Sequence, residues 1–341
     1  MPNIYIKTSN IYNILSFLLL LKIANLKGAL FMWNLNKIFK KKEGTEMTFN
    51  NLANEWLEYK KNSIKESTYY NYLLCIENYL KPNLKDIKLN ETINYNDLIN
   101  KLSETLAPKT IKDIITILKS IFKYYEEEYE THLKIKKANV PKLARKKLKI
   151  LTKSEKNKME SYCIKHNDLK EIGIIICLNT GLRIGEICGL KWKDVNLDEK
   201  TISVKRTVQR IYNKNSHTTK VIIGKPKTDS SIRTIPISNK LLKVLKPLKK
   251  KYKDDYYVLS DDIKYVEPRD YQYFFKTLLK RLKIKPYKFH ILRHTFASEC
   301  IEVGMDVKSL SEILGHSNVN ITLNIYVHSN YKLKKKYLEK L

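Results

Sequence analysis

Between residues 47 and 130 the apolar positions recur every three or four residues, which is the spacing of a helix that buries one face. In the last part of this region Pro108 suits the first turn of a helix. The apolar stripe that follows consists of Ile111, Ile114, Ile115, Leu118, Ile121 and Phe122. The pattern predicts a small domain of four helices, at residues 48–61, 66–80, 94–106 and 107–129.

A different pattern begins after residue 150. A capping box from Thr152 to Glu155 marks a helix start, and helical segments continue to about Trp192. Three segments have strand character, being rich in β-branched residues and punctuated by Asn, Gly and Pro: 201–212, 218–225 and 232–238. Helices resume near Asn239. The chain is therefore expected to be mainly α, with a small helical domain followed by an α+β domain that has one small antiparallel sheet.

Two stretches fit neither pattern. Residues 136–150 are rich in lysine and predict a basic linker that could lie along a DNA backbone. Residues 1–46 contain an apolar run, Ile11–Trp33, but lysines interrupt it, so the uninterrupted part is short for a transmembrane helix. An interfacial or signal role stays open for this extension, as does a later translation start at Met32 or Met47.

The chain is strongly basic. Its 341 residues include 65 Lys and Arg against 35 Asp and Glu, a formal net charge of +30. Such a balance favours a polyanionic partner, nucleic acid before an acidic membrane surface, although a codon bias toward lysine would give the same composition. The five cysteines lie in apolar runs without a CxxC pair, which indicates reduced, buried thiols in a cytoplasmic protein.

The motifs of nucleotide and metal chemistry are missing from the sequence. There is no GxxxxGKS/T loop, no GxGxxG after a strand, no HExxH and no carboxylate cluster for two metal ions. We therefore expect chemistry that uses neither ATP nor a metal, and no cofactor.

Arginine is rare in this chain and stands at selected positions. Only eight of the basic residues are arginines. Arg183 follows Gly181 by two residues, where one helix is expected to stop and another to begin, and Arg293 is a second candidate. A guanidinium matches two non-bridging phosphate oxygens, which an ammonium cannot do, so both arginines are candidates for a phosphate clamp. The alternative is structural, for example an ion pair of Arg183 with Glu186 at helical spacing.

Further polar residues gather in the last quarter of the chain. His290, Arg293 and His294 lie at i, i+3 and i+4, and would share one face of a helix. His316 follows in "LGHSN" and Tyr326 in "TLNIYVH". A single histidine is usually structural, but this combination in a basic protein favours a functional site.

Together these motifs resemble the tyrosine recombinase (phage integrase) family over about residues 47–341. The matching motifs are "TGLRIGE" with Arg183, "KPKTDSSIRTIPI" with Lys227, "HILRHTFAS" with His290 and Arg293, and "LGHSNVNITLNIYVH" with His316 and Tyr326. Taken alone, Lys227 would be one more surface lysine, at a predicted hairpin turn between two strands. The order and spacing of the six positions make the resemblance specific.

The resemblance implies a division of the chain. Residues 47–135 would form a helical core-binding domain that contacts DNA, residues 136–150 the basic linker, and residues 151–341 the catalytic domain. Many integrases of this type carry a separate domain for arm-type sites at their N-terminus. Residues 1–46 are too short and too apolar to resemble it, which leaves the role of this extension open.

The resemblance also implies a reaction. Tyr326 would attack the scissile phosphodiester, forming a 3′-phosphotyrosyl intermediate and releasing a 5′-hydroxyl. Arg183 and Arg293 would bind the non-bridging oxygens, where charge builds in the transition state. Tyr331 and Tyr337 are rival nucleophiles by residue type, but the spacing from "LGH" favours Tyr326.

The remaining positions would move protons or hold the phosphate. Lys227 would protonate the leaving 5′-oxygen, His290 would assist proton transfer and His316 would donate a hydrogen bond to the phosphate. His294 is expected to pack within its helix or to support its neighbours rather than to touch the phosphate.

The implied activity is that of a site-specific DNA recombinase that integrates or excises a mobile element. Its partners would be double-stranded DNA and three further copies of the chain in a homo-tetramer, with an excisionase and a DNA-bending host protein as further candidates and no membrane. The alternatives are a resolvase of chromosome or plasmid dimers, which uses the same chemistry, and a DNA-binding regulator without catalysis.

Overall fold

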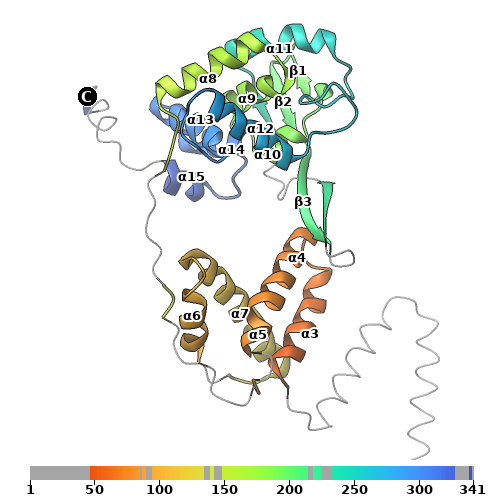
Figure 1. Cartoon of the computed structure of the whole chain (residues 1–341), viewed down its shortest axis with the longest axis vertical. Helices are drawn as coiled ribbons and strands as arrows, with labels where there is room; N and C mark the ends of the chain where they lie inside the picture. The colour runs from red at the N-terminus through yellow and green to blue at the C-terminus, as the bar shows by residue number, and fades with distance from the viewer. Residues whose placement is uncertain are drawn as a thin grey trace, which may run out of the picture. The chain divides into compact units, whose positions relative to one another are not determined.

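The computed structural model describes residues 47–84, 87–89, 94–133, 139–141, 148–213, 218–224, 232–326 and 338–339. The described residues belong to two compact units, one within residues 1–143 and the other within residues 144–341 (Figure 1). The apolar run Ile11–Trp33 and most of the basic linker at 136–150 lie outside the described residues.

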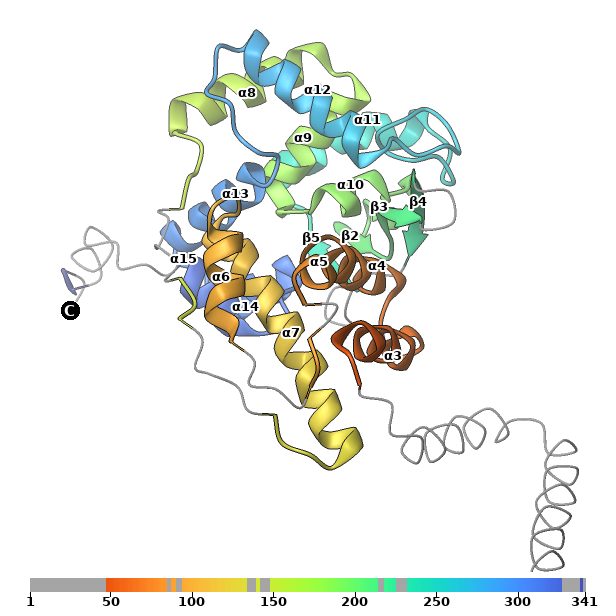
Figure 2. The ribbon, with the colours of Figure 1, turned by 60° about the horizontal axis from the view of Figure 1, so that its bottom comes forward.

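The first unit is helical, as the apolar spacing predicts. Its elements are α3 (Phe49–Lys61), α4 (Glu66–Cys75), the π-helical turn η1 (Ile76–Leu80), α5 (Lys81–Leu84), α6 (Tyr95–Ser103) and α7 (Pro108–Tyr129). Each predicted segment is confirmed, except that the segment predicted as one helix at 66–80 changes to π geometry for its last five residues. Helix α6 lies beside α7 (Figure 2).

The core of this unit is made by the predicted stripes. All the apolar stripe residues of α7 are buried, and α3 contributes Phe49, Leu52, Ala53, Trp56 and Leu57. The rings of Phe49 and Phe122 meet edge to face, with centroids 5.9 Å apart. Helix α3 begins where Thr48 accepts a hydrogen bond from the backbone N–H of Asn51, so a capped start and an apolar face place it against α7.

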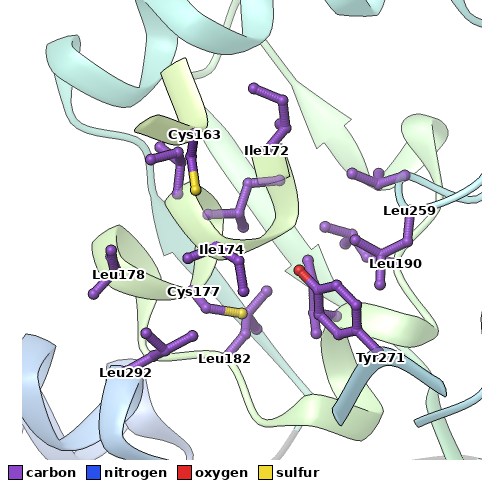
Figure 3. Close-up of a cluster of buried hydrophobic side chains, with 14 of the residues drawn as sticks. Cys163, Ile172, Ile174, Cys177, Leu178, Leu182, Leu190, Leu259, Tyr271 and Leu292 are labelled. Carbon is purple, nitrogen blue, oxygen red and sulfur yellow. The ribbon is translucent and has the colours of Figure 1, made fainter. Parts of the chain in front are cut away.

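The second unit wraps helices around a buried central helix. Its helices are α8 (Lys153–His166), α9 (Leu169–Thr180), α10 (Ile184–Cys188), α11 (Asn239–Lys251), α12 (Pro268–Arg281), α13 (Ile291–Glu302), α14 (Val307–Leu314) and α15 (Val319–Tyr326), with a 3₁₀ turn η2 (Trp192–Asp194). The predicted capping box of α8 is present. Helix α9 is apolar on all sides from Ile172 to Leu178 and is buried there, and the core cluster that it belongs to includes Cys163, Ile174, Cys177 and Tyr271 (Figure 3).

The strands of this unit form two sheets where the sequence predicts one. They are β1 (Val195–Asn196), β2 (Thr201–Val204), β3 (Thr207–Asn213), β4 (Thr218–Gly224) and β5 (Arg233–Pro236). Within the described residues, β1, β2 and β5 form an antiparallel sheet in the order β1-β2-β5, and β3 pairs with β4 in a two-stranded ribbon. The predicted strand at 201–212 is therefore two strands that belong to different sheets.

This topology corrects the expected setting of Lys227. The strands before and after it, β4 and β5, do not pair with each other, so the prediction of a hairpin turn between them is wrong. The reason is that Ile202 and Val204 on β2 enter the same buried core as Ile235, which draws β5 against β2. Lys227 itself lies outside the described residues.

Two smaller expectations concern cysteines and membranes. All five cysteines are buried and free, as predicted. Among the described residues, no helix has the length and apolar character needed to span a bilayer.

Candidate active site

Arg183 projects from a turn whose geometry depends on glycine. Helix α9 ends at Gly181, which has a φ of +67°, and Arg183 is the residue that caps α10. A Cβ atom at Gly181 would lie 2.7 Å from Cδ1 of Phe296 and 2.8 Å from Cδ2 of Leu314. Both the left-handed backbone and the close packing therefore require glycine at position 181. The backbone that carries Arg183 is held in one conformation by this turn.

The side chain of Arg183 is paired and exposed at the same time. One terminal nitrogen donates to Oε1 of Glu186 at 2.7 Å, and the other donates to the carbonyl oxygen of Gly315 at 3.0 Å. The side chain is still 35% exposed. The structural ion pair and the phosphate contact are therefore compatible, because Glu186 and Gly315 orient a guanidinium that remains open to solvent.

Arg293 is more deeply placed than the sequence suggests. It is 1% exposed, and its terminal nitrogens donate to the carbonyl oxygens of Gly181 at 2.9 Å and Leu314 at 2.8 Å. Arg293 therefore joins the glycine turn that precedes Arg183 to the end of α14. Any contact with a phosphate would come at the small exposed part of this residue.

A third arginine completes this arrangement, and the sequence reasoning missed it. Arg233, the first residue of β5, donates through Nε to the carbonyl oxygen of Ile313 and through both terminal nitrogens to Glu186, at 3.1 and 2.9 Å. Arg233 lies in the motif "KPKTDSSIRTIPI", which also contains Lys227. The rarity of arginine in this chain is the one feature of the sequence that could have indicated a role for it.

His316 follows directly after the carbonyl groups that these arginines hold. Its Nδ1 lies 2.8 Å from Oγ1 of Thr322, a fully buried residue on α15. The pKa of His316 is lowered to about 4, first because protein atoms displace water from the ring and then because Arg293 and Arg183 repel a proton. At neutral pH the ring is uncharged, with Nδ1 engaged by Thr322.

His290 and His294 stand at the start of α13. Their rings meet edge to face, with centroids 4.6 Å apart. The pKa of His290 is lowered to about 4, first by loss of surrounding water and then by His294, Arg293 and Arg183. His290 also keeps an exposed surface, so solvent screens part of this effect. The pKa of His294 is lowered as well, by burial and by Arg293.

The structure thus brings together Arg183, Arg293, His290 and His316, and adds Arg233 and Glu186. Arg293 and Arg183 donate to the carbonyl groups of Leu314 and Gly315, directly before His316, and in addition to burial their positive charge lowers the pKa of His316 and His290. Arg293 lies on α13, His290 precedes α13 and His316 lies between α14 and α15, and these three helices pack against one another (Figure 1). An anion would meet concentrated positive charge there, beside uncharged imidazoles.

The backbone of the predicted nucleophile, Tyr326, lies at the end of α15. Tyr326 is the last residue of α15, four residues after the Thr322 that contacts His316. The rival residues Tyr331 and Tyr337 lie outside the described residues, as does Lys227. Among the described residues, no group of histidine, cysteine, aspartate and glutamate side chains could hold a metal ion.

The lowered pKa of His316 predicts its response to acid. Since the folded pKa of about 4 lies below the ordinary value of 6.5, the unfolded chain binds a proton first as the pH falls. We expect the free energy of unfolding to decrease between pH 6.5 and 4, and the His316 ring to titrate near the lower limit. NMR of ¹³C-labelled histidine in the full chain measures this, with His316→Gln to assign the signal. A midpoint near 6.5 would contradict it.

The sequence of this chain matches one protein family and one family of domains. The phage integrase family matches residues 143–332, and the phage integrase N-terminal SAM-like domain matches residues 48–103. A protein named tyrosine recombinase XerC-like, from Caldanaerobacter subterraneus subsp. tengcongensis, is 30% identical over 325 residues, which cover 87% of this chain and 83% of that protein.

Solved structures of integrases share the fold. The Tn1549 transposon integrase, in complex with transposon right end DNA, has a TM-score of 0.69 at 24% identity and covers 86% of this chain and 99% of its own. A lambda integrase tetramer bound to a Holliday junction has a TM-score of 0.60 at 17% identity and covers 83% of this chain and 78% of its own. With a family match over more than half of its length and a bacterial relative along most of it, the chain belongs to the phage integrase family of tyrosine recombinases.

Proposed function

We propose that this chain cuts and rejoins DNA at specific sites through a covalent 3′-phosphotyrosyl intermediate. The observation that carries the proposal is the meeting of Arg183, Arg293, His290 and His316 at the end of α14. A phosphodiester is a monoanion with two non-bridging oxygens, and guanidinium groups beside neutral imidazoles are suited to bind it.

DNA is the proposed substrate. The formal net charge of +30 favours a polyanion, and the Tn1549 and lambda integrases with the same fold are bound to DNA in their solved structures. In this proposal residues 47–135 form the core-binding domain and residues 151–341 carry the chemistry. Phosphate contacts would position the duplex, while base contacts would select the site.

The reaction conserves the number of phosphodiester bonds. The phenolic oxygen of Tyr326 attacks phosphorus as the bond to the 5′-oxygen breaks, which leaves a 3′-phosphotyrosyl ester and a free 5′-hydroxyl. The phenolic proton passes to a base, for which neutral His290 is the proposed group, and Lys227 donates a proton to the leaving oxygen. Attack by a 5′-hydroxyl of the partner strand reverses these steps, so rejoining requires no ATP.

The surrounding charges would stabilise the transition state. Negative charge grows on the non-bridging oxygens during attack, and preorganised donors lower its energy more than they lower that of bound DNA. Arg183 is open to solvent and would contact one oxygen directly, while Arg293 would act from the base of the site. His316 would donate a hydrogen bond through Nε2 in the tautomer in which Nδ1 accepts a hydrogen bond from the hydroxyl of Thr322.

We propose further that the chain works as a homo-tetramer on two duplexes and integrates or excises a mobile element. The support is analogy: the lambda integrase of the same fold is a tetramer on a Holliday junction, and the Tn1549 integrase comes from a transposon. Resolution of chromosome or plasmid dimers would use the same residues, so the DNA sequence that is cut must separate the two roles.

Covalent capture of DNA tests the chemistry and the role together. The full chain is incubated with sheared genomic DNA of its source and denatured, and the DNA that stays attached to protein is sequenced. We expect strongly enriched fragments with the protein linked at a 3′-phosphate. Fragments from the ends of a mobile element support integration or excision, whereas fragments from a single chromosomal or plasmid resolution site support the resolvase. Specific binding without covalent attachment would overturn the proposal and leave a regulator.

A further inference from the structure

The cluster contains one buried carboxylate that two guanidiniums share. Both oxygens of Glu186 accept hydrogen bonds from Arg233, at 3.1 and 2.9 Å, while Oε1 also accepts from Arg183 at 2.7 Å. Burial alone would raise the pKa of Glu186, but the hydrogen bonds and charge of Arg233, together with Arg183, hold it below its usual value. Glu186 is therefore ionised, and the three groups carry one net positive charge.

This sharing determines how much charge Arg183 can offer to a phosphate. If Glu186 faced Arg183 alone, the two would form a neutral pair, and Glu186 would compete with an incoming anion for the same guanidinium. Arg233 engages both carboxylate oxygens, so it relieves that competition. Its own side chain is only 6% exposed, compared with 35% for Arg183, so it is placed to act through Glu186 rather than on DNA.

Arg233 also takes part in a second contact, at the end of α14. Three consecutive carbonyl groups there accept hydrogen bonds from three arginines: Ile313 from Arg233, Leu314 from Arg293 and Gly315 from Arg183. The last carbonyl groups of a helix have no partner within it and form its negative end, which suits cationic donors. His316 is the next residue, so its position depends on how firmly this end is held.

We propose that Arg233 is a positioning residue of the active site, which keeps Glu186 from neutralising Arg183 and fixes the end of α14 that carries His316. The inference depends on the proposed function for the reaction that it supports. It does not require Arg233 to touch the substrate. It joins strand β5 to two elements of the site, α10 and α14.

The test begins with Arg233→Gln, which removes the charge and the fork. We expect DNA affinity within about twofold of wild type, because Arg233 is shielded from solvent. The rate of single-turnover cleavage, on a nicked suicide duplex made from the captured DNA, should fall on the order of 100-fold, as for a misplacement of about 1 Å in an active site. Unchanged cleavage by the folded variant would overturn the proposal.

A second substitution separates charge sharing from simple support. Adding Glu186→Gln to Arg233→Gln removes the carboxylate that would otherwise neutralise Arg183, so we expect the rate to recover by about 10-fold, a coupling within the range for residues in contact. A double variant slower than the single one would refute the charge argument. Arg233→Lys covers the case in which Arg233→Gln does not fold. Its cleavage rate should lie between those of the wild-type protein and Arg233→Gln. A full wild-type rate would exclude a role for the planar guanidinium of Arg233.

Arg206 provides a matched control. It also holds a buried carboxylate, that of Asp194, and donates through Nε to a backbone carbonyl, that of Gly189, at 3.1 Å. We expect both Arg206→Gln and Arg233→Gln to lower the melting temperature. Only Arg233→Gln should also lower the cleavage rate of the folded protein. An equal rate loss in both variants would mean that general destabilisation explains the effect, and would overturn the proposal.

The titration of His316 gives a readout that does not depend on catalysis. Arg233 is among the positive charges that lower the pKa of His316, so Arg233→Gln should raise the midpoint measured by NMR, while Arg233→Lys should keep it near the wild-type value. If the wild-type chain captured no DNA, the proposed function would fail, yet this shift would still support the role of Arg233. No shift would count against it.

Discussion

Tyr326→Phe is expected to abolish covalent capture of DNA while leaving DNA binding intact. The substitution removes only the phenolic oxygen that would attack phosphorus, and Phe keeps the ring. In the proposed reaction this oxygen forms the ester itself, so the loss should exceed that for removal of a stabilising donor, which costs about 100- to 1,000-fold. Denaturing gels with labelled duplex measure the adduct, and band shifts under native conditions measure binding.

The other two candidate tyrosines give the matched controls. Tyr331→Phe and Tyr337→Phe remove the same oxygen from positions 5 and 11 residues further along the chain. Both variants should form the adduct at close to the wild-type rate. If adduct persisted in Tyr326→Phe and disappeared in one of the controls, the nucleophile would be that other tyrosine, and the assignment from the "LGH" spacing would be wrong.

Replacing the two arginines of the proposed phosphate clamp by lysine is expected to separate binding from cleavage. Arg183→Lys keeps the charge but loses the planar fork, so one ammonium must serve Glu186, Gly315 and the phosphate together. Cleavage should fall by about 100- to 1,000-fold, the usual cost of one lost donor to a developing oxyanion, with DNA affinity changed only a few fold. Single-turnover rates and binding isotherms at fixed salt measure the two effects.

Arg293→Lys should have an additional effect on folding. Arg293 is buried and bridges Gly181 and Leu314, and a lysine cannot reach both carbonyl groups with the same geometry. We expect a collapse of cleavage together with a lower melting temperature, whereas Arg183→Lys should melt close to wild type. Arg281→Lys, at the exposed end of α12, is the control for arginine replacement in general. Near-normal cleavage by either clamp variant would contradict the clamp.

Local features of the fold were predictable because they depend on neighbouring residues. The stripe of α7 and the capping box of α8 act over three or four positions, and both are confirmed. The pairing of β5 with β2, rather than with β4, was not predictable in this way, because it depends on which apolar side chains meet in the core. The π turn at Ile76–Leu80 likewise has no sequence signal that the spacing reveals.

The candidate site shows the same limit. The resemblance placed Arg183 and Arg293 in one site, and the structure does bring them to the same helix end. Their differing exposure could not be read from the sequence, because burial of Arg293 depends on α9 and α14 packing around it. Arg233 lies 47 residues from Glu186 and 80 from Ile313, distances at which spacing carries no information.

The hydrogen bonds from three arginines to the end of α14 affect when the site can form during protein synthesis. These hydrogen bonds join residues separated by 132 positions for Arg183 and Gly315 and by 80 for Arg233 and Ile313. Contacts between such distant parts of a chain form slowly, because closing a long loop costs entropy before the contact compensates for it. Under the proposed function, a nascent or partly unfolded chain would thus lack a working site even with every proposed catalytic side chain present, and it would not cut DNA before the fold is complete.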